Sequence, residues 1–274
     1  MIYLGPAGVP LTASDKSTIG GVRRVAELGL NAMEVEFVRG VSMGREMARK
    51  VGIEARKLGV RLSVHCPYFV NLCSVEKVKL EASKRRILDS ADRAHAMGAD
   101  LVVFHPGFYG KLTPQQALEA VVEACTDLRK RMEKARMEEV CLGLETMGKQ
   151  KTFGTLEEIL TVSREVEGCV PVVDWAHLYA RSAGEVKWGE VFERVRHLKH
   201  LHTHFTGVEF RVVGPGKGNE DHHLEMPAGK PPFEPLGEEI LKRKVDITII
   251  SESPALERDS LLMREFFEKR GVRF

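Results

Sequence analysis

The chain alternates short apolar runs with longer amphipathic runs, and it does so eight times. Several apolar runs are rich in β-branched residues and uninterrupted by polar ones, which is typical of strands buried on both faces of a parallel sheet. We expect strands at residues 2–5, 32–37, 61–66, 101–105, 140–145, 170–174, 198–204 and 247–252. Apolar residues at three- and four-residue spacing predict helices at residues 22–28, 45–57, 75–97, 114–137, 156–166, 189–196, 235–242 and 260–270. This alternation predicts an α/β fold, the (β/α)8 TIM barrel.

The length of the chain suits one such barrel, so we expect a single domain over residues 1–274. An open doubly wound sheet is the main alternative. That fold usually shows a G-x-G-x-x-G fingerprint after an early strand, and the sequence has none there. One long stretch, residues 207–233, contains the run GPGKG and a Pro-Pro pair, so we expect it to be irregular. Loops of this length are usually functional.

Composition sets broad limits on location and partners. The formal net charge of +2 neither requires nor excludes a nucleic-acid partner. The first residues lack a basic, apolar signal segment, and no window approaches a membrane span, so we expect no membrane partner. The five cysteines form no CxxC pair, which is typical of reduced thiols in a cytoplasmic protein. We expect a monomer.

Imidazoles and carboxylates recur where the expected strands end. The third to sixth strands end at His65, His105, Glu145 and Asp174, and the eighth ends at Glu252. In a TIM barrel, catalytic groups gather at the carboxyl ends of the strands. Burying such groups without partners is costly, so their convergence at one rim predicts a metal site.

Further candidates follow the sixth and seventh strands. His177 lies one turn beyond Asp174, and alternation puts His202 and His204 on one face of the seventh strand. The long stretch after it adds Glu220, Asp221, His222 and His223. One catalytic zinc needs about three protein ligands, so the whole set suffices for two or three ions. Mixed nitrogen and oxygen ligands favour zinc, with manganese as the second choice. Clustered ions about 3.5–4 Å apart are typical of phosphoester hydrolysis.

These residues give the chain a resemblance to the endonuclease IV family of apurinic/apyrimidinic endonucleases, within the xylose-isomerase-like barrels. The matching segments run in family order: HCPYFVNL at 65–72, VFHPG at 103–107, LETMG at 144–148, D-x-x-H at 174–177, the strand-seven histidine, the D-x-H of the long stretch, and Ser251-Glu252. This chain departs from the family at residues 34–40. It carries Glu34 and Glu36 there, where the family has a polar and basic segment that penetrates DNA.

The resemblance implies three zinc ions and their ligands. One ion would be bound by His65, His105 and Glu145; a second by Glu145, Asp174, the strand-seven histidine and Glu252; and a third by His177, Asp221 and His223. Two positions stay open. His204 fits the strand-seven ligand better, because Phe205-Thr206 follows it, but His202 aligns if the strand is matched from its start. The pair Glu220-x-His222 has the same spacing as Asp221-x-His223.

The implied activity is metal-dependent hydrolysis of DNA on the 5′ side of abasic sites, as in base excision repair. Glu145 would act catalytically by bridging two ions and orienting the nucleophile, and Tyr68 and Asn71 would contact the abasic or damaged duplex. A sugar isomerase or epimerase of the same barrel superfamily is the alternative, and such enzymes need fewer ligands and only one or two ions. A barrel that binds metal or nucleic acid without catalysis comes third.

Overall fold

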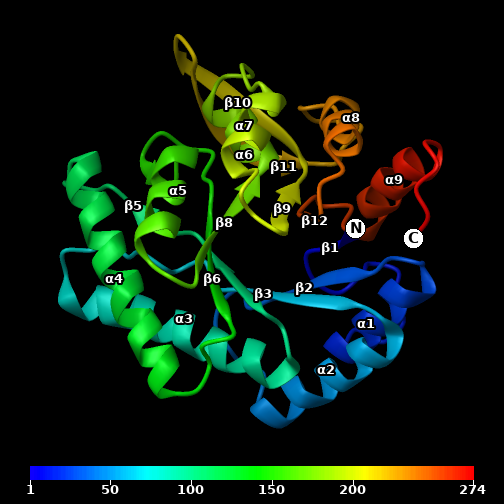
Figure 1. Ribbon diagram of the computed structural model, residues 1–274, viewed down its shortest axis with the longest axis horizontal. Helices are drawn as coiled ribbons and strands as arrows, with labels where there is room; N and C mark the ends of the chain where they lie inside the picture. Colours follow the sequence, from blue (N-terminus) through cyan, green and yellow to red (C-terminus); the bar gives the residue numbers. More distant parts are fainter.

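The eight expected strands form one parallel sheet that curves into a barrel surrounded by helices (Figure 1). The structure is a computed structural model that describes all 274 residues. In spatial order the strands are β1 (Ile2–Pro6), β12 (Ile247–Ser251), β9 (Leu201–Phe205), β8 (Cys169–Asp174), β6 (Cys141–Glu145), β4 (Leu101–Phe104), β3 (Arg61–His65) and β2 (Ala32–Glu36). The barrel is nearly closed, and the prediction of a single-domain TIM barrel is confirmed.

The seam of the barrel lies between β1 and β2, where a parallel bridge joins Ala7 to Glu34. A side-chain carbon on Gly5 would lie 1.6 Å from the carbonyl oxygen of Ala32. Only glycine permits this close approach of two backbones, so Gly5 allows the first two strands to meet. The seam brings Glu34 of β2 into the interior of the barrel.

Nine helices accompany the strands, one more than we expected. They are α1 (Thr18–Glu27), α2 (Arg45–Leu58), α3 (Lys77–Met97), α4 (Pro114–Lys134), α5 (Leu156–Glu165), α6 (Trp175–Arg181), α7 (Trp188–Val195), α8 (Glu234–Arg243) and α9 (Glu257–Glu268). Sequence explains their starts: Thr113 caps α4 in a capping box, and Pro114 occupies its first turn. The unexpected helix, α6, begins directly after β8, and Asp174 caps it by accepting the backbone N–H of His177 at 2.7 Å.

The prediction that residues 207–233 are irregular is wrong for most of that stretch. Residues 207–224 form an antiparallel hairpin of β10 (Gly207–Gly214) and β11 (Lys217–Leu224), which projects from the barrel (Figure 1). The GPGKG run spans the reversal: Pro215 and Gly216, with a φ of 62°, make the turn, and the two outer glycines belong to β10 and β11. The Pro-Pro pair lies beyond β11. The hairpin packs on α6.

The core fills the barrel interior and the layer between the strands and the helices. Strand residues such as Val64, Val102 and Ile249 are fully buried. A short antiparallel pair, β5 (Gly107–Phe108) with β7 (Thr152–Phe153), follows β4 and β6 at the rim. None of the helices combines the length and apolar character that crossing a membrane requires.

Candidate metal centre

Six neighbouring strands deliver an imidazole or a carboxylate to the carboxyl-terminal rim of the barrel. His65, Glu145 and Asp174 are the last residues of β3, β6 and β8, and His204 lies in β9. His105 and Glu252 follow β4 and β12. Parallel strands end at one rim, so these side chains meet there with those of α6 and the hairpin. Three groups have ligand atoms within 4.8 Å of one another: His65, His105 and Glu145; Glu145, Asp174, His204 and Glu252; and His177, Glu220 and His223.

The first group is centred on one oxygen of Glu145. The Nε2 atoms of His65 and His105 lie 3.2 and 3.1 Å from Glu145 Oε2. The Nδ1 atom of His65 lies 2.8 Å from the carbonyl oxygen of Cys66, which assigns its N–H to Nδ1 when the ring is neutral. The lone pair of Nε2 then faces Glu145, which is the arrangement of a metal-binding histidine held by a backbone carbonyl.

The second group concentrates three carboxylates around Nδ1 of His204. Glu252 Oε1 lies 3.1 Å from this nitrogen and Glu145 Oε1 lies 3.5 Å from it. Asp174 lies directly opposite His204 in the register of the neighbouring strands β8 and β9. Glu145 Oε1 and Asp174 Oδ2 are buried without a hydrogen-bond partner. Buried carboxylate oxygens of this kind need a cation, so the residues of this group fit a metal ion.

The third group joins α6 to the hairpin. His177 Nδ1 lies 2.8 Å from the carbonyl oxygen of Thr146, and His223 Nδ1 lies 3.1 Å from that of Glu252. Both contacts assign the N–H to Nδ1, so both Nε2 lone pairs are free in the neutral rings. The two Nε2 atoms lie 3.4 Å apart, and Glu220 Oε2 lies 3.3 Å from that of His177. Two facing lone pairs repel unless a cation lies between them.

The hairpin places one expected ligand, Asp221, outside the three groups. Residues of β10 and β11 pair as Glu209 with His222 and then Phe210 with Glu220, so Asp221 is the extra residue of a β-bulge. The bulge turns Glu220 and His223 to the same side, although they are three residues apart. Asp221 instead pairs with Arg211 at 3.2 Å, and the open alternative His222 is exposed beside Glu209. The structure thus brings Glu220 with His223 to the centre, a combination that neither expected spacing contained.

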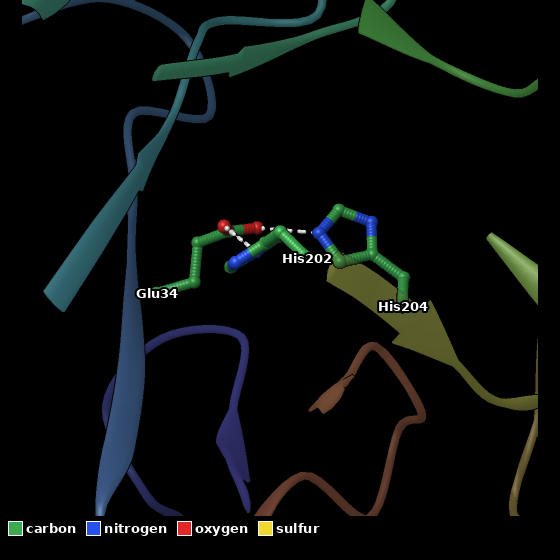
Figure 2. A group of neighbouring side chains, drawn as sticks. All are labelled: Glu34, His202 and His204. Atoms are coloured by element: carbon green, nitrogen blue, oxygen red, sulfur yellow. Dashed lines mark hydrogen bonds and ion pairs between the residues drawn. The ribbon is translucent and has the colours of Figure 1, made fainter. Parts of the chain in front are cut away.

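The strand-seven alternative is also decided by geometry. His204 belongs to the group around Glu145, whereas His202 lies below it with Nε2 3.1 Å from Glu34 Oε2. Glu34, His202 and His204 form a fourth group of ligand-type side chains (Figure 2). We did not expect Glu34 to take part, although its alternation with Glu36 along β2 places both on one face of the strand.

A cavity of about 670 Å³ opens over the rim and reaches members of all three groups. His105, His177, Glu252 and the unexpected Glu36 line it. Tyr68 stands at its edge and is 54% exposed.

Asn71, the other expected substrate contact, does not line this cavity. Its Oδ1 accepts the backbone N–H groups of Cys73 and Phe108 at 3.1 and 3.2 Å. Through these bonds Asn71 shapes the loop beneath Tyr68, and its expected contact with a substrate stays a prediction.

Burial and charge shift the pKa values of the clustered groups in opposite directions. Burial lowers the pKa of His65, but the carboxylates of Glu36 and Glu145 outweigh it and raise this pKa to about 10. Burial raises the pKa of Asp174 to about 6 and that of Glu36 to about 8. In Glu145, burial opposes ionisation, yet His105 and His204 hold the pKa well below its usual value. Carboxylates and imidazoles therefore stabilise each other's charges until a cation replaces the protons.

A TIM barrel with a ligand-rich rim defines the class of this protein, and comparison with known families agrees. Residues 22–269 match the xylose isomerase-like TIM barrel family, and the chain belongs to it. An uncharacterised protein of Methanocaldococcus jannaschii is 31% identical over 281 residues and covers 98% of both chains. A probable endonuclease 4 of Mycoplasmoides gallisepticum is 27% identical over 209 residues, covering 73% of this chain and 67% of its own.

Solved structures share the fold. Endonuclease IV from Thermus thermophilus superposes with a TM-score of 0.67 at 21% identity, covering 96% of this chain and 99% of its own. A D-tagatose 3-epimerase-like protein superposes with a TM-score of 0.70 at 20% identity, covering 96% of each chain. The expected resemblance to endonuclease IV is confirmed by these similarities, which extend equally to epimerases at the level of the fold.

Proposed function

We propose that this protein is a zinc-dependent phosphodiesterase that cleaves DNA on the 5′ side of abasic sites. Up to three zinc ions would be bound by the three ligand groups at the rim, with Glu145 shared between two of them. Bound ions would supply the activated water and the positive charge that phosphoester hydrolysis requires. Manganese is the second choice of metal, because the ligands are nitrogen and oxygen atoms.

The observation that carries this proposal is the group of His177, Glu220 and His223. An ion at the two strand-borne groups would serve a sugar enzyme equally well. The hairpin group adds two imidazoles whose Nε2 atoms lie 3.4 Å apart, and it faces the same cavity. A third ion at this position has a purpose in phosphodiester cleavage, where charge develops on several oxygens.

Charge balance also favours an anionic substrate. The ligand groups contain four carboxylates, from Glu145, Asp174, Glu220 and Glu252. Three divalent ions would exceed that negative charge and leave a positive surplus, provided that the imidazoles are neutral. The loaded cavity would therefore attract a phosphodiester.

The mouth of the cavity has the chemistry to contact a nucleic acid. The rings of Tyr68 and Phe108 are 54% and 53% exposed, and Lys149 lines the same cavity. Exposed aromatic rings stack on unpaired bases, and an ammonium group binds backbone phosphate. The five cysteines are unpaired, which supports action in a reducing compartment such as the cytoplasm. We infer that the protein acts as a monomer.

Epimerisation of a sugar is the second candidate, and Glu36 favours it. The carboxylate of Glu36 lines the cavity but belongs to none of the ligand groups. One of its oxygens is buried without a hydrogen-bond partner. The part of the side chain that lines the cavity is the part that could accept a sugar hydroxyl. The D-tagatose 3-epimerase-like structure shares the barrel, although its likeness extends to the fold alone.

Elemental analysis and an incision assay on the same sample test the two candidates. The purified protein, loaded with zinc, is incubated with duplex DNA containing one abasic site, with and without chelator. The proposal expects about three ions per chain and chelator-sensitive incision on the 5′ side of the site. A fully loaded protein that leaves this DNA intact contradicts it. One ion per chain together with turnover of a ketose would establish the epimerase.

A further inference from the structure

Glu34 is a fully buried carboxylate that lies beneath the metal centre and outside its cavity. Three polar side chains converge on it, two of which, His202 and His204, are shown in Figure 2. The hydroxyl of Ser63 donates to Oε2 at 2.6 Å, and His202 Nε2 lies 3.1 Å from the same oxygen. His204 Nε2 lies 2.9 Å from Oε1. A substrate in the cavity cannot reach Glu34, so any effect that it has on catalysis must pass through these neighbours.

His204 has a carboxylate at each nitrogen. On its Nδ1 side lie Glu252 at 3.1 Å and Glu145 at 3.5 Å, and on its Nε2 side lies Glu34. A neutral imidazole has one N–H and one lone pair, so only one of its two nitrogens can bind an ion. The question is which side of the ring receives the metal.

The unmet charge lies on the Nδ1 side. Glu145 Oε1 and Asp174 Oδ2 are buried there without hydrogen-bond partners, and the group has three carboxylates for one imidazole. Glu34 is already stabilised by Ser63 and His202 through Oε2, and only its Oε1 is unmatched. His177 Nδ1 lies 3.1 Å from Glu145 Oε1, but the carboxylates still outnumber the imidazoles there, so a cation fits the Nδ1 side, whereas a single N–H satisfies the other.

We propose that Glu34 is a positioning residue that fixes His204 as an Nδ1 ligand by accepting its Nε2–H. This inference rests on the proposed metal centre and deepens it. In the structure the 2.9 Å contact is short, but it is not aligned as a hydrogen bond, because neither atom has a hydrogen-bond partner. An ion bound at Nδ1 would leave the proton of the neutral ring on Nε2, the nitrogen that lies beside Glu34. Carboxylates behind metal-bound histidines raise the basicity of the ring and fix its orientation.

The test compares metal binding by the wild-type protein and Glu34→Gln. Zinc affinity is measured by competition with a chromophoric chelator, and bound zinc is counted by elemental analysis. The variant keeps the shape of the side chain but loses its charge, so the affinity for one ion per chain should fall about 10–100-fold. His204→Ala should weaken the same ion. Glu257→Gln, which alters another buried carboxylate outside the ligand groups, should leave zinc binding unchanged.

A spectroscopic readout separates positioning from general destabilisation. In zinc-loaded wild-type protein with ¹⁵N-labelled histidine, His204 should show a proton on Nε2 and an ion on Nδ1. Unchanged zinc affinity in Glu34→Gln would overturn the proposal. A second result would also overturn it: a fourth ion in the wild type, bound to a nitrogen of His202 and lost in Glu34→Gln. Glu34 would then be a metal ligand itself. None of these measurements uses DNA. The inference about Glu34 can therefore fail while the proposed activity stands, and the proposed activity can fail while the inference stands.

Discussion

The ligands borne by the barrel strands and those borne by the hairpin differ in how firmly the chain fixes them. His65, Glu145 and Asp174 end buried parallel strands whose register is set on both sides. Glu220 and His223 lie on a two-stranded hairpin that projects from the barrel, and a bulge decides which of its residues face the centre. The comparison teaches that the proposed metal centre combines a rigid half with a half that depends on a single inserted residue.

The largest expected effect comes from Glu145→Gln, because Glu145 belongs to both strand-borne groups. We expect the variant to lose two ions while the hairpin group keeps its own. Metal ions contribute several kcal/mol to such reactions, so incision of abasic DNA should fall about 1,000-fold or more. Elemental analysis and the incision rate measure the two effects. Glu123→Gln, at an exposed position of α4, is the control. Retention of all ions would show that Glu145 is not shared.

A pair of variants on neighbouring residues tests the bulge. Glu220→Gln should weaken the hairpin ion at least about tenfold, since it replaces a ligand, whereas Asp221→Asn should leave zinc binding unchanged. Chelator competition measures both. If Asp221→Asn lost the ion and Glu220→Gln kept it, the hairpin would bind metal in a register different from the one described.

A third prediction moves the hairpin without changing a ligand. A side-chain carbon on Gly218 would lie 2.1 Å from the carbonyl oxygen of Ala180 in α6, so Gly218→Ala must shift β11. Overpacking of this kind costs about 1–3 kcal/mol of stability. We expect weaker binding of the hairpin ion and unchanged binding by the strands. Gly214→Ala is the matched control, because the nearest atom to its added carbon is 4.0 Å away. Equal losses in both groups would mean that the two halves are not independent.

The smallest expected effect is the release of a proton from His65, in the strand-borne half of the site, when zinc binds. With a pKa of about 10, His65 is protonated at pH 8 in the ion-free protein and must lose its proton to bind zinc. Zinc binding should therefore release about one proton from this group, and affinity should rise with pH. Calorimetry in buffers of different ionisation enthalpy measures the release, which His65→Gln should reduce. Identical release by the variant would contradict the assignment.

The sign for folding is the reverse of the sign for metal binding. The pKa of His65 in the folded, ion-free protein is raised above the unfolded value of about 6.5. Its charged form therefore stabilises the ion-free fold fully below about pH 6.5, and this contribution is lost as the pH rises through about 10. Urea unfolding of the ion-free protein at several pH values measures the loss.

The sequence allowed the barrel and the strand-borne ligands to be predicted because both follow from simple regularities. Eight buried runs imply parallel strands, and residues that end such strands share a rim. On the hairpin, the sequence predicts His223 but pairs it with Asp221 and not with Glu220, because two-residue alternation cannot reveal where a bulge inserts an extra residue. Asn71 matches a family motif, but a motif does not show which partners a side chain has. In the structure its Oδ1 accepts two backbone N–H groups. Glu34 could have been found from the alternation of β2.

Asp174 connects helix α6 to the group around Glu145. One of its oxygens caps α6, and the other, buried and unpartnered, faces the group around Glu145. A helix of seven residues is too short to persist by itself in water, so α6 relies on this cap and on the hairpin packed against it. The strand-borne group and the helix that carries His177 thus share the side chain of Asp174, so its substitution should disturb both.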